Sequence, residues 1–229
     1  MIAVIGDIHG CFYTLVNLVE QVKQKYTNIP IYSVGDLIDR GKHSFEVMDF
    51  ILSEEIIFTA GNHDLMFYHF FKKPSTIFGQ SWSYNGNEAT LKSYEKHEQE
   101  LFMHINKIKE APLYLDLDDC FISHAGISLY YKRKLPKNFN ENLDILKSFI
   151  ENDYYDDYGV MWNRDSLLNI GKLQIVGHTK HKDVYLDKNA NAAYIDTGAY
   201  ARNKLSAVVV SNNEVKDILS TETSLNDVI

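Results

Sequence analysis

The chain has 229 residues, of which 45% are hydrophobic and 24% charged, a balance typical of a globular protein rather than a disordered one. This length suits one α/β domain with a sizeable core. The formal net charge of −8 argues against non-specific nucleic-acid binding, which depends on Lys and Arg neutralising phosphates. An acidic surface does not exclude a phosphate substrate, because bound metal ions can invert the local field.

The two cysteines, Cys11 and Cys120, are too few for a disulfide framework and are expected to be free thiols in a reducing compartment. The N-terminal residues lack the basic region and cleavage site of a signal peptide. No apolar run approaches the roughly 20 residues of a membrane span. We therefore expect a cytoplasmic protein with no membrane partner.

The first 60 residues alternate between apolar runs and amphipathic segments. The runs at 2–6, 29–34 and 55–60 predict buried strands, and the helical spacing of apolar residues predicts helices over 12–26 and 44–53. This β-α-β-α-β order is typical of a parallel sheet with right-handed crossovers.

The rest of the chain changes character after a helical stretch. Residues 64–110 are predicted to be mostly helical, with breaks near Pro74 and Gly79, and a further helix is expected near 141–151. Apolar runs predict strands at 112–117, 119–123, 172–176, 183–187, 192–196, 205–210 and 213–218. We expect an α/β (α+β) fold of two packed sheets with helices outside. A single domain would occupy 1–218, followed by a polar tail at 219–229.

Polar clusters follow five of the predicted strands, at 6–10, 35–41, 61–64, 123–126 and 177–179. In open α/β sheets, ligands bind beyond the carboxyl ends of the strands. We therefore expect the clusters to share one edge, where their glycines permit tight turns and close backbone approach.

These clusters supply oxygen and nitrogen donors and no thiolate: Asp7, His9, Asp36, Asn62, His124 and His178. Such a set suits Mn, Fe, Zn or Co better than Ca or a cysteine-rich zinc site. Six ligands are too many for one catalytic metal with open positions. They suit two metals about 3.5–4 Å apart that share a carboxylate.

The string GDIHG…GDLIDRG…GNHD…HAG…GHT, which spans Asp7 to His178, resembles the calcineurin-like metallophosphoesterase superfamily. Within it, the string is similar to the phosphoprotein phosphatase family, which includes bacterial serine/threonine phosphatases and symmetrical diadenosine tetraphosphate hydrolases. The resemblance implies an α/β/β/α sandwich of mixed sheets with two divalent metals. Manganese is the expected metal on these grounds, with Fe, Zn, Co or Ni as alternatives. Asp64, where the family often has Glu, and Ala125 are departures that remove no ligand.

By position, the resemblance also assigns a role to each ligand. Asp7 and His9 would hold the first metal, and Asp36 would bridge the two. The second metal would be held by the remaining ligands, which are Asn62, His124 and His178.

The same resemblance assigns catalytic roles next to the metals. His63 would be the general acid, oriented by Asp39. Arg40 and Arg164, the latter in the segment 161–165, would bind the substrate phosphate together with Asn62 and His63. These roles agree with elementary chemistry, because guanidinium groups match phosphate oxygens and a histidine can protonate a leaving alkoxide.

The implied function is a phosphoric monoester hydrolase, acting on phosphoserine or phosphothreonine in proteins by in-line attack of a metal-bridging hydroxide. Hydrolysis of diadenosine tetraphosphate or another small phosphoester would use the same ligands. A phosphodiesterase or nuclease is disfavoured by Arg40 and by the acidic charge. A non-catalytic metal-binding module would be expected to have lost ligands. No nucleic-acid partner is expected, and the oligomeric state is left open.

Two further regions carry alternatives. Substrate choice is expected to depend on residues 74–110, where Trp82, Tyr84 and Tyr94 could stack on a nucleobase or pack against a peptide. Cys11 lies near the metal edge, where either a redox role or a buried small residue is compatible with the sequence; the buried residue is preferred.

Overall fold

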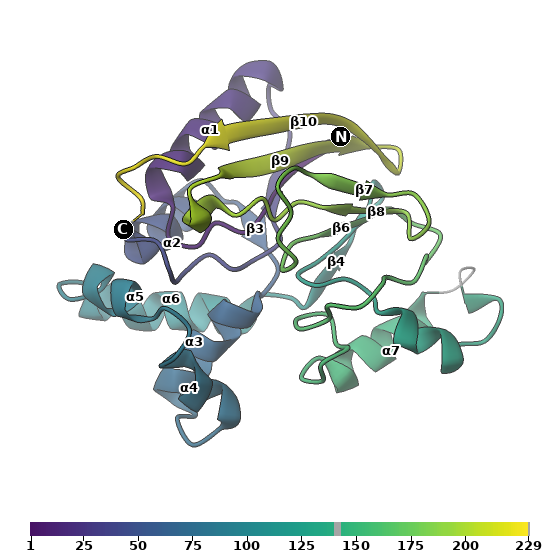
Figure 1. Cartoon of the computed structure of the whole chain (residues 1–229), viewed down its shortest axis with the longest axis horizontal. Helices are drawn as coiled ribbons and strands as arrows, with labels where there is room; N and C mark the ends of the chain where they lie inside the picture. The colour runs from purple at the N-terminus through teal and green to yellow at the C-terminus, as the bar shows by residue number, and fades with distance from the viewer. Residues whose placement is uncertain (140–142, 229) are drawn as a thin grey trace.

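The computed structural model describes residues 1–139 and 143–228 and contains two five-stranded mixed sheets (Figure 1). The first sheet has the order β10-β9-β1-β2-β3 and the second the order β4-β5-β6-β8-β7. The strands of the first sheet are β1 (Ile2–Ile5), β2 (Ile31–Ser33), β3 (Ile57–Phe58), β9 (Lys204–Ser211) and β10 (Glu214–Glu222). Those of the second are β4 (Tyr114–Asp116), β5 (Phe121–Ser123), β6 (Gln174–Val176), β7 (Tyr185–Asp187) and β8 (Ala192–Tyr194).

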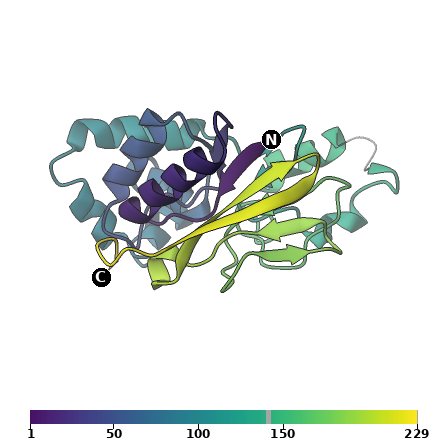
Figure 2. The same cartoon turned by 90° about the horizontal axis from the view of Figure 1, so that it is seen from above.

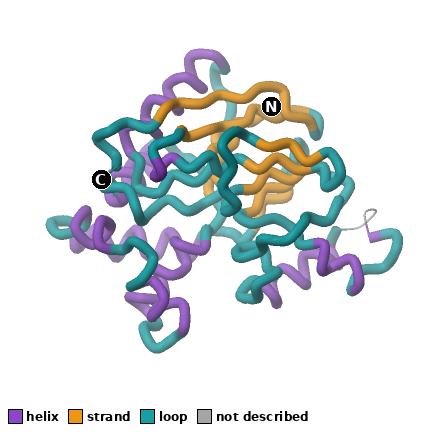
Figure 3. Tube along the Cα trace, viewed as in Figure 1, coloured by secondary structure: helices purple, strands orange, loops and turns teal. Residues whose placement is uncertain are grey.

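In the view of Figure 3 the helices lie to the left of the strands and below them. The α-helices are α1 (Phe12–Lys25), α2 (Ser44–Ser53), α3 (Asn62–Lys72), α4 (Ile77–Trp82), α5 (Glu88–Ser93), α6 (Glu98–Glu110) and α7 (Asp144–Asp153). Two short 3-10 helices are η1 (Leu129–Arg133) and η3 (Ala199–Ala201). Within the described residues, no helix is long and apolar enough to span a membrane.

The alternation of side chains along β1 explains the layering. Ala3 and Ile5 pack into a core shared with the helices, whereas Ile2 and Val4 pack into a second core that contains Ile122 of the other sheet. Because successive side chains of a strand point to opposite faces, a fully buried strand must be covered on both sides. On the other side of the second sheet, Phe121 of β5 shares a core with Leu146 and Ile150 of α7. The order is therefore helix, sheet, sheet, helix, which agrees with the predicted sandwich.

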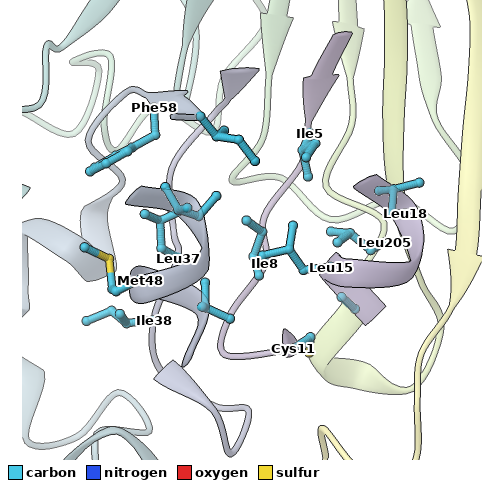
Figure 4. Close-up of a cluster of buried hydrophobic side chains, with 14 of the residues drawn as sticks. Ile5, Ile8, Cys11, Leu15, Leu18, Leu37, Ile38, Met48, Phe58 and Leu205 are labelled. Carbon is cyan, nitrogen blue, oxygen red and sulfur yellow. The ribbon is translucent and has the colours of Figure 1, made fainter. Parts of the chain in front are cut away.

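The helix-side core is continuous between the first sheet and the first two helices. Figure 4 shows Leu15 and Leu18 of α1 beside Leu205 of β9, with Ile5 of β1 nearby. Met48 of α2 belongs to the same cluster. Seen from above, α1 lies across the face of this sheet (Figure 2).

The parallel pairs β1–β2 and β2–β3 confirm the predicted β-α-β-α-β unit. The helix expected over 44–53 has the predicted bounds, and the break at Pro74 lies between α3 and α4. The expected break at Gly79 is wrong, because Gly79 lies inside α4. A Cβ at this position would come within 3.1 Å of the carbonyl oxygens of His69 and Lys73. The glycine therefore serves the close approach of α4 to the end of α3.

The C-terminal segment also differs from the expected loose tail. Strand β10 continues to Glu222, and Asp227 and Val228 are buried. The main-chain carbonyl of Asp227 accepts a hydrogen bond from the Lys42 N–H at 2.9 Å, which joins this segment to the loop after β2. The helix expected near 141–151 runs from Asp144 to Asp153, and residues 141 and 142 lie outside the described part of the chain.

Candidate metal centre

The six predicted ligands come together at the carboxyl ends of strands from both sheets. Asp7 and His9 follow β1, Asp36 follows β2, and Asn62 opens α3. His124 and His178 follow β5 and β6 of the second sheet. A cavity of about 230 Å³ at this place is lined by Asp7, His9, Asp36, Arg40, Asn62, His63, Arg164, His178, Lys180, Asp196 and Tyr200.

Asp36 lies at the centre of the ligand set. Its Oδ2 is 3.4 Å from Nε2 of His9 and 3.5 Å from Nε2 of His124. Two groups of closely spaced donors share this carboxylate, one with His9 and His63 and one with His124 and His178. Asp36 is therefore the residue whose position suits a bridge between two cations.

Main-chain hydrogen bonds set the orientation of two of the histidines. Nδ1 of His9 donates to the Ile38 carbonyl, and Nδ1 of His124 donates to the Val34 carbonyl, both at 2.9 Å. When Nδ1 carries the proton, Nε2 presents a lone pair. A hydrogen bond from the other ring nitrogen is also the usual way in which proteins orient metal-binding histidines.

Asn62 lies between two of the histidines, His124 and His178. Its Oδ1 lies 3.0 Å from Nε2 of His124 and 2.9 Å from Nδ1 of His178. The main-chain N–H of His178 donates to Oδ2 of Asp7 at 3.0 Å, so His178 also contacts the ligand that follows β1. The oxygen and nitrogen donors thus converge across the boundary between the two sheets.

The electrostatics of the cluster favour a cation. Burial and the neighbouring Asp196 raise the pKa of Asp7, and burial with the nearby Asp36 raises the pKa of Asp64 to about 7. Closely spaced buried carboxylates disfavour one another's charged form, and a bound divalent ion would relieve that cost. The donor set of carboxylate, amide and imidazole therefore fits divalent metals.

His63 and Asp39 form a buried pair beside this cluster. Nδ1 of His63 donates to Oδ2 of Asp39 at 2.7 Å, and Asp39 is fully buried. Asp39 has two more donors that the sequence did not indicate, the indole Nε1 of Trp82 and the hydroxyl of Thr90, each at 2.8 Å. The other nitrogen of His63, Nε2, accepts from Arg40 at 2.9 Å.

Cationic groups border the cavity. The Arg40 guanidinium donates to Nε2 of His9 at 3.1 Å and lies 4.3 Å from the ring centroid of Tyr200. Arg164 lines the same cavity and donates to the His178 carbonyl at 3.4 Å. Lys180 also lines it, with Nζ 5.5 Å from the Tyr200 ring. Sequence reasoning found the two arginines but not Lys180 or Tyr200.

The backbone at these positions is unusual. Five candidate site residues that are not glycine have positive φ angles: His9 (48°), Asp36 (49°), Asp39 (72°), Arg40 (69°) and His178 (61°). Such left-handed conformations cost roughly 1–3 kcal/mol each and cluster at functional sites. The surrounding sandwich holds these side chains in place against that cost.

The structure also decides several sequence-based alternatives. Trp82 is fully buried and Tyr94 is 4% exposed, so the proposed stacking on a nucleobase or peptide is wrong for both. Tyr84 is 90% exposed. Cys11 is buried, and burial raises the pKa of its thiol, as expected for a small core residue. Asp196 also lines the cavity.

A family model described as calcineurin-like phosphoesterase matches residues 1–210. The asymmetrical bis(5'-nucleosyl)-tetraphosphatase PrpE of Anoxybacillus flavithermus is 31% identical, and the alignment covers 95% of this chain and 94% of that protein. Serine/threonine-protein phosphatase 2 of Salmonella typhimurium is 29% identical, with 89% of each chain covered.

Solved structures share the fold at lower identity. The cold-active protein-tyrosine phosphatase of a Shewanella species has a TM-score of 0.64 at 16% identity, covering 97% of this chain and 80% of its own. A serine/threonine phosphatase of Saccharomyces cerevisiae has a TM-score of 0.55 at 17% identity, with the same coverage. At these identities the likeness shows the architecture alone.

Proposed function

Because the chain belongs to the calcineurin-like phosphoesterase family, we propose that it is a two-metal phosphomonoesterase that acts on phosphoserine or phosphothreonine in proteins. The observation that carries this proposal is the buried His63–Asp39 pair, with 2.7 Å between Nδ1 and Oδ2. A serine or threonine alkoxide is a poor leaving group and must be protonated as the P–O bond breaks. A positioned histidine supplies such a proton.

In this proposal Asp7 and His9 would hold one metal and Asn62, His124 and His178 would hold the other, with Asp36 available to both. Manganese is the proposed metal, and the donor set also accepts Fe, Zn, Co or Ni. When bound at this place, two divalent ions would supply charge neutralisation for a phosphate and would lower the pKa of a water to about 7.

Proton transfer is assigned to His63. Its Nε2 faces the cavity, where the Arg40 guanidinium is 2.9 Å away. Asp39 fixes the ring through Nδ1 and stabilises the imidazolium form, as a carboxylate does in hydrolase triads. In the proposed reaction the protonated Nε2 would deliver its proton to the leaving oxygen, with Arg40 donating to the phosphate instead of to this nitrogen.

Arg40 and Arg164 are assigned to the phosphate oxygens, with Asn62 and His63 beside them. Both guanidinium groups line the same cavity. Arg40 donates to the ring nitrogens of His9 and His63, and Arg164 donates to the His178 carbonyl. A planar guanidinium can donate two parallel hydrogen bonds to a phosphate. Their combined charge suits a phosphomonoester dianion despite the −8 of the whole chain.

Diadenosine tetraphosphate is the second candidate substrate, and Lys180 is the observation that favours it. Lys180 adds a third cation to the cavity wall, more than a single phosphate needs. An adjoining cavity of about 380 Å³ contains Phe78 and Trp162, whose rings stack at a centroid distance of 5.4 Å. Aromatic rings of this kind can take either a base or a peptide side chain. The relative from Anoxybacillus flavithermus is named for this type of substrate.

The deciding experiment compares kcat/KM of the Mn-loaded protein on a phosphoserine/phosphothreonine peptide and on diadenosine tetraphosphate. A clear preference for the peptide supports the protein-phosphatase assignment. Preference for the dinucleotide overturns the substrate while leaving the metal chemistry intact. In that case ATP with AMP would indicate asymmetrical cleavage, and two molecules of ADP would indicate symmetrical cleavage.

A further inference from the structure

The indole of Trp82 and the hydroxyl of Thr90 contact the carboxylate that orients the proposed acid. The Trp82 Nε1–H donates at 2.8 Å to Oδ2 of Asp39, the same oxygen that accepts from His63 at 2.7 Å. The Thr90 hydroxyl donates at 2.8 Å to Oδ1. Both oxygens of the carboxylate are thus engaged, so the carboxylate cannot rotate without losing hydrogen bonds.

All of these groups are buried. Trp82, Thr90 and Asp39 are each fully buried, and His63 is 2% exposed. The Thr90 oxygen also accepts from the main-chain N–H of Asp39 at 3.0 Å, so it fixes the backbone as well as the side chain. In such surroundings a lost donor is not replaced by bulk water. The geometry of the His63–Asp39 pair therefore depends on two side chains from α4 and α5.

From these contacts we infer that Trp82 and Thr90 are positioning residues for general-acid catalysis, acting through Asp39 on His63. Trp82 is 43 residues from Asp39 in the chain and Thr90 is 51 residues from it. Helices α4 and α5, between α3 and α6, would therefore affect proton transfer through Asp39, without contacting the substrate. The inference rests on the proposed function, because it takes His63 to be the acid.

A purely structural role is the alternative explanation. The Trp82 ring packs against Phe67 and Phe70, with centroid distances of 5.3 and 4.8 Å, so it also contributes to the core. Loss of core packing lowers the fraction of folded enzyme and therefore lowers the rate on every substrate by the same factor. Loss of acid positioning lowers the rate only where the leaving group needs a proton. The two explanations differ in the dependence on the leaving group.

The test uses Trp82→Phe, which keeps an aromatic ring but deletes the N–H, and Thr90→Val, which keeps the shape but deletes the hydroxyl. Tyr94→Phe is the matched control, because it deletes a buried hydrogen bond to His104, 2.8 Å long, that does not reach Asp39. Each Mn-loaded variant is assayed on a phosphoserine peptide and on p-nitrophenyl phosphate, whose leaving group needs little protonation. Metal content is measured in parallel.

We expect kcat on the peptide to fall roughly 10- to 100-fold in Trp82→Phe and Thr90→Val, the range for lost outer-sphere hydrogen bonds. On p-nitrophenyl phosphate the loss should be less than about threefold. Thr90→Ser, which keeps a hydroxyl, should recover the peptide rate, and Tyr94→Phe should show no difference between substrates. Equal losses on both substrates, or no loss, would overturn the inference.

His63→Asn separates this inference from the proposed function. If His63→Asn is selective for the peptide and the Trp82 and Thr90 variants are not, the positioning inference alone is wrong. If His63→Asn loses the same factor on both substrates, the acid assignment fails and the inference fails with it. Should Trp82→Phe not fold, the Thr90→Val and Thr90→Ser pair gives the same decision.

Discussion

Two of the proposed metal ligands, His9 and His124, and the proposed acid, His63, are held by different parts of the molecule. His9 and His124 are oriented by main-chain carbonyls, those of Ile38 and Val34, in the loop between β2 and α2 and at the end of β2. His63 is oriented by Asp39, which in turn contacts side chains from α4 and α5. The orientation of His9 and His124 thus depends on main-chain groups at and after a strand end, whereas that of His63 depends on side chains of a helical segment outside the sheets.

This difference has a physical consequence for mutation. A main-chain carbonyl cannot be removed by substituting a side chain, so the orientation of His9 and His124 is protected against most substitutions around them. A side-chain carboxylate and its two donors can each be deleted separately. We therefore expect that a substitution can remove proton transfer while both metals stay bound. A substitution that removes a metal should remove all activity, so the opposite result is not expected.

The largest expected effect comes from removing a proposed metal ligand. His124→Ala removes a donor that lies 3.0 Å from Asn62 Oδ1 and 3.5 Å from Asp36 Oδ2. We expect loss of one metal per chain and a fall in kcat on the order of 1000-fold on every phosphoester, because a metal contributes several kcal/mol of charge stabilisation. Elemental analysis beside the activity assay checks this. Full metal content in the variant would contradict the assigned ligand role.

His63→Asn removes the proposed general acid and keeps the proposed metal ligands. Both metals should remain bound, and kcat on a phosphoserine peptide or an alkyl phosphate should fall roughly 100-fold or more, the usual contribution of general-acid catalysis. The loss on p-nitrophenyl phosphate should be clearly smaller, since its leaving group departs without a proton. The same factor on the alkyl and nitrophenyl substrates would show that His63 is not the acid.

Lys180→Met tests substrate binding separately from the His63–Asp39 pair, because Lys180 lines the cavity as a third cation. If a second phosphate binds there, kcat/KM for diadenosine tetraphosphate should fall roughly tenfold, as expected for one charged hydrogen bond. The peptide rate should change little. Lys182→Met, on the same loop but outside the lining of that cavity, is the matched control. Equal changes in the two variants would remove the argument for a second phosphate position.

The smallest expected effect on catalysis comes from Asp227, a buried carboxylate outside the site. Its oxygens accept hydrogen bonds from the main-chain N–H groups of Tyr13 and Thr14, each at 2.9 Å, in the first turn of α1. Asp227→Ala should lower the free energy of unfolding by about 1–3 kcal/mol, through the lost helix cap and unpaired buried donors. Denaturant titration measures this loss.

The activity of Asp227→Ala tests whether a loss of stability alone can change the ratio of rates on the two substrates. The folded fraction of this variant should keep the wild-type ratio of rates on the peptide and on p-nitrophenyl phosphate, because Asp227 does not contact Asp39 or His63. A changed ratio would mean that leaving-group selectivity reports on global stability rather than on acid positioning.

Much of the site followed from short-range pattern. A buried apolar run that stops at Gly-Asp or Gly-Asn identifies a strand end, and parallel strands bring their carboxyl ends to one edge. That rule was sufficient to group Asp7, Asp36 and Asn62. It also placed His124 and His178, since each follows an apolar run. The order of these motifs and the period of the apolar residues also predicted two sheets with helices outside.

The partners of Asp39 and the cap of α1 could not be predicted in this way. Trp82 and Thr90 carry no local signal that distinguishes a hydrogen bond to Asp39 from ordinary core packing, and Asp227 looks like part of a polar tail. Their contacts join residues that are 43 to 214 positions apart. Periodicity reports which face of an element is buried, but not which distant loop it meets. The sequence by itself therefore identified the candidate metal-binding side chains and their order along the chain. Only the tertiary structure decided which side chains hold the acid and the termini in place, because buried polar groups take whichever partner the packing of the sandwich brings to them.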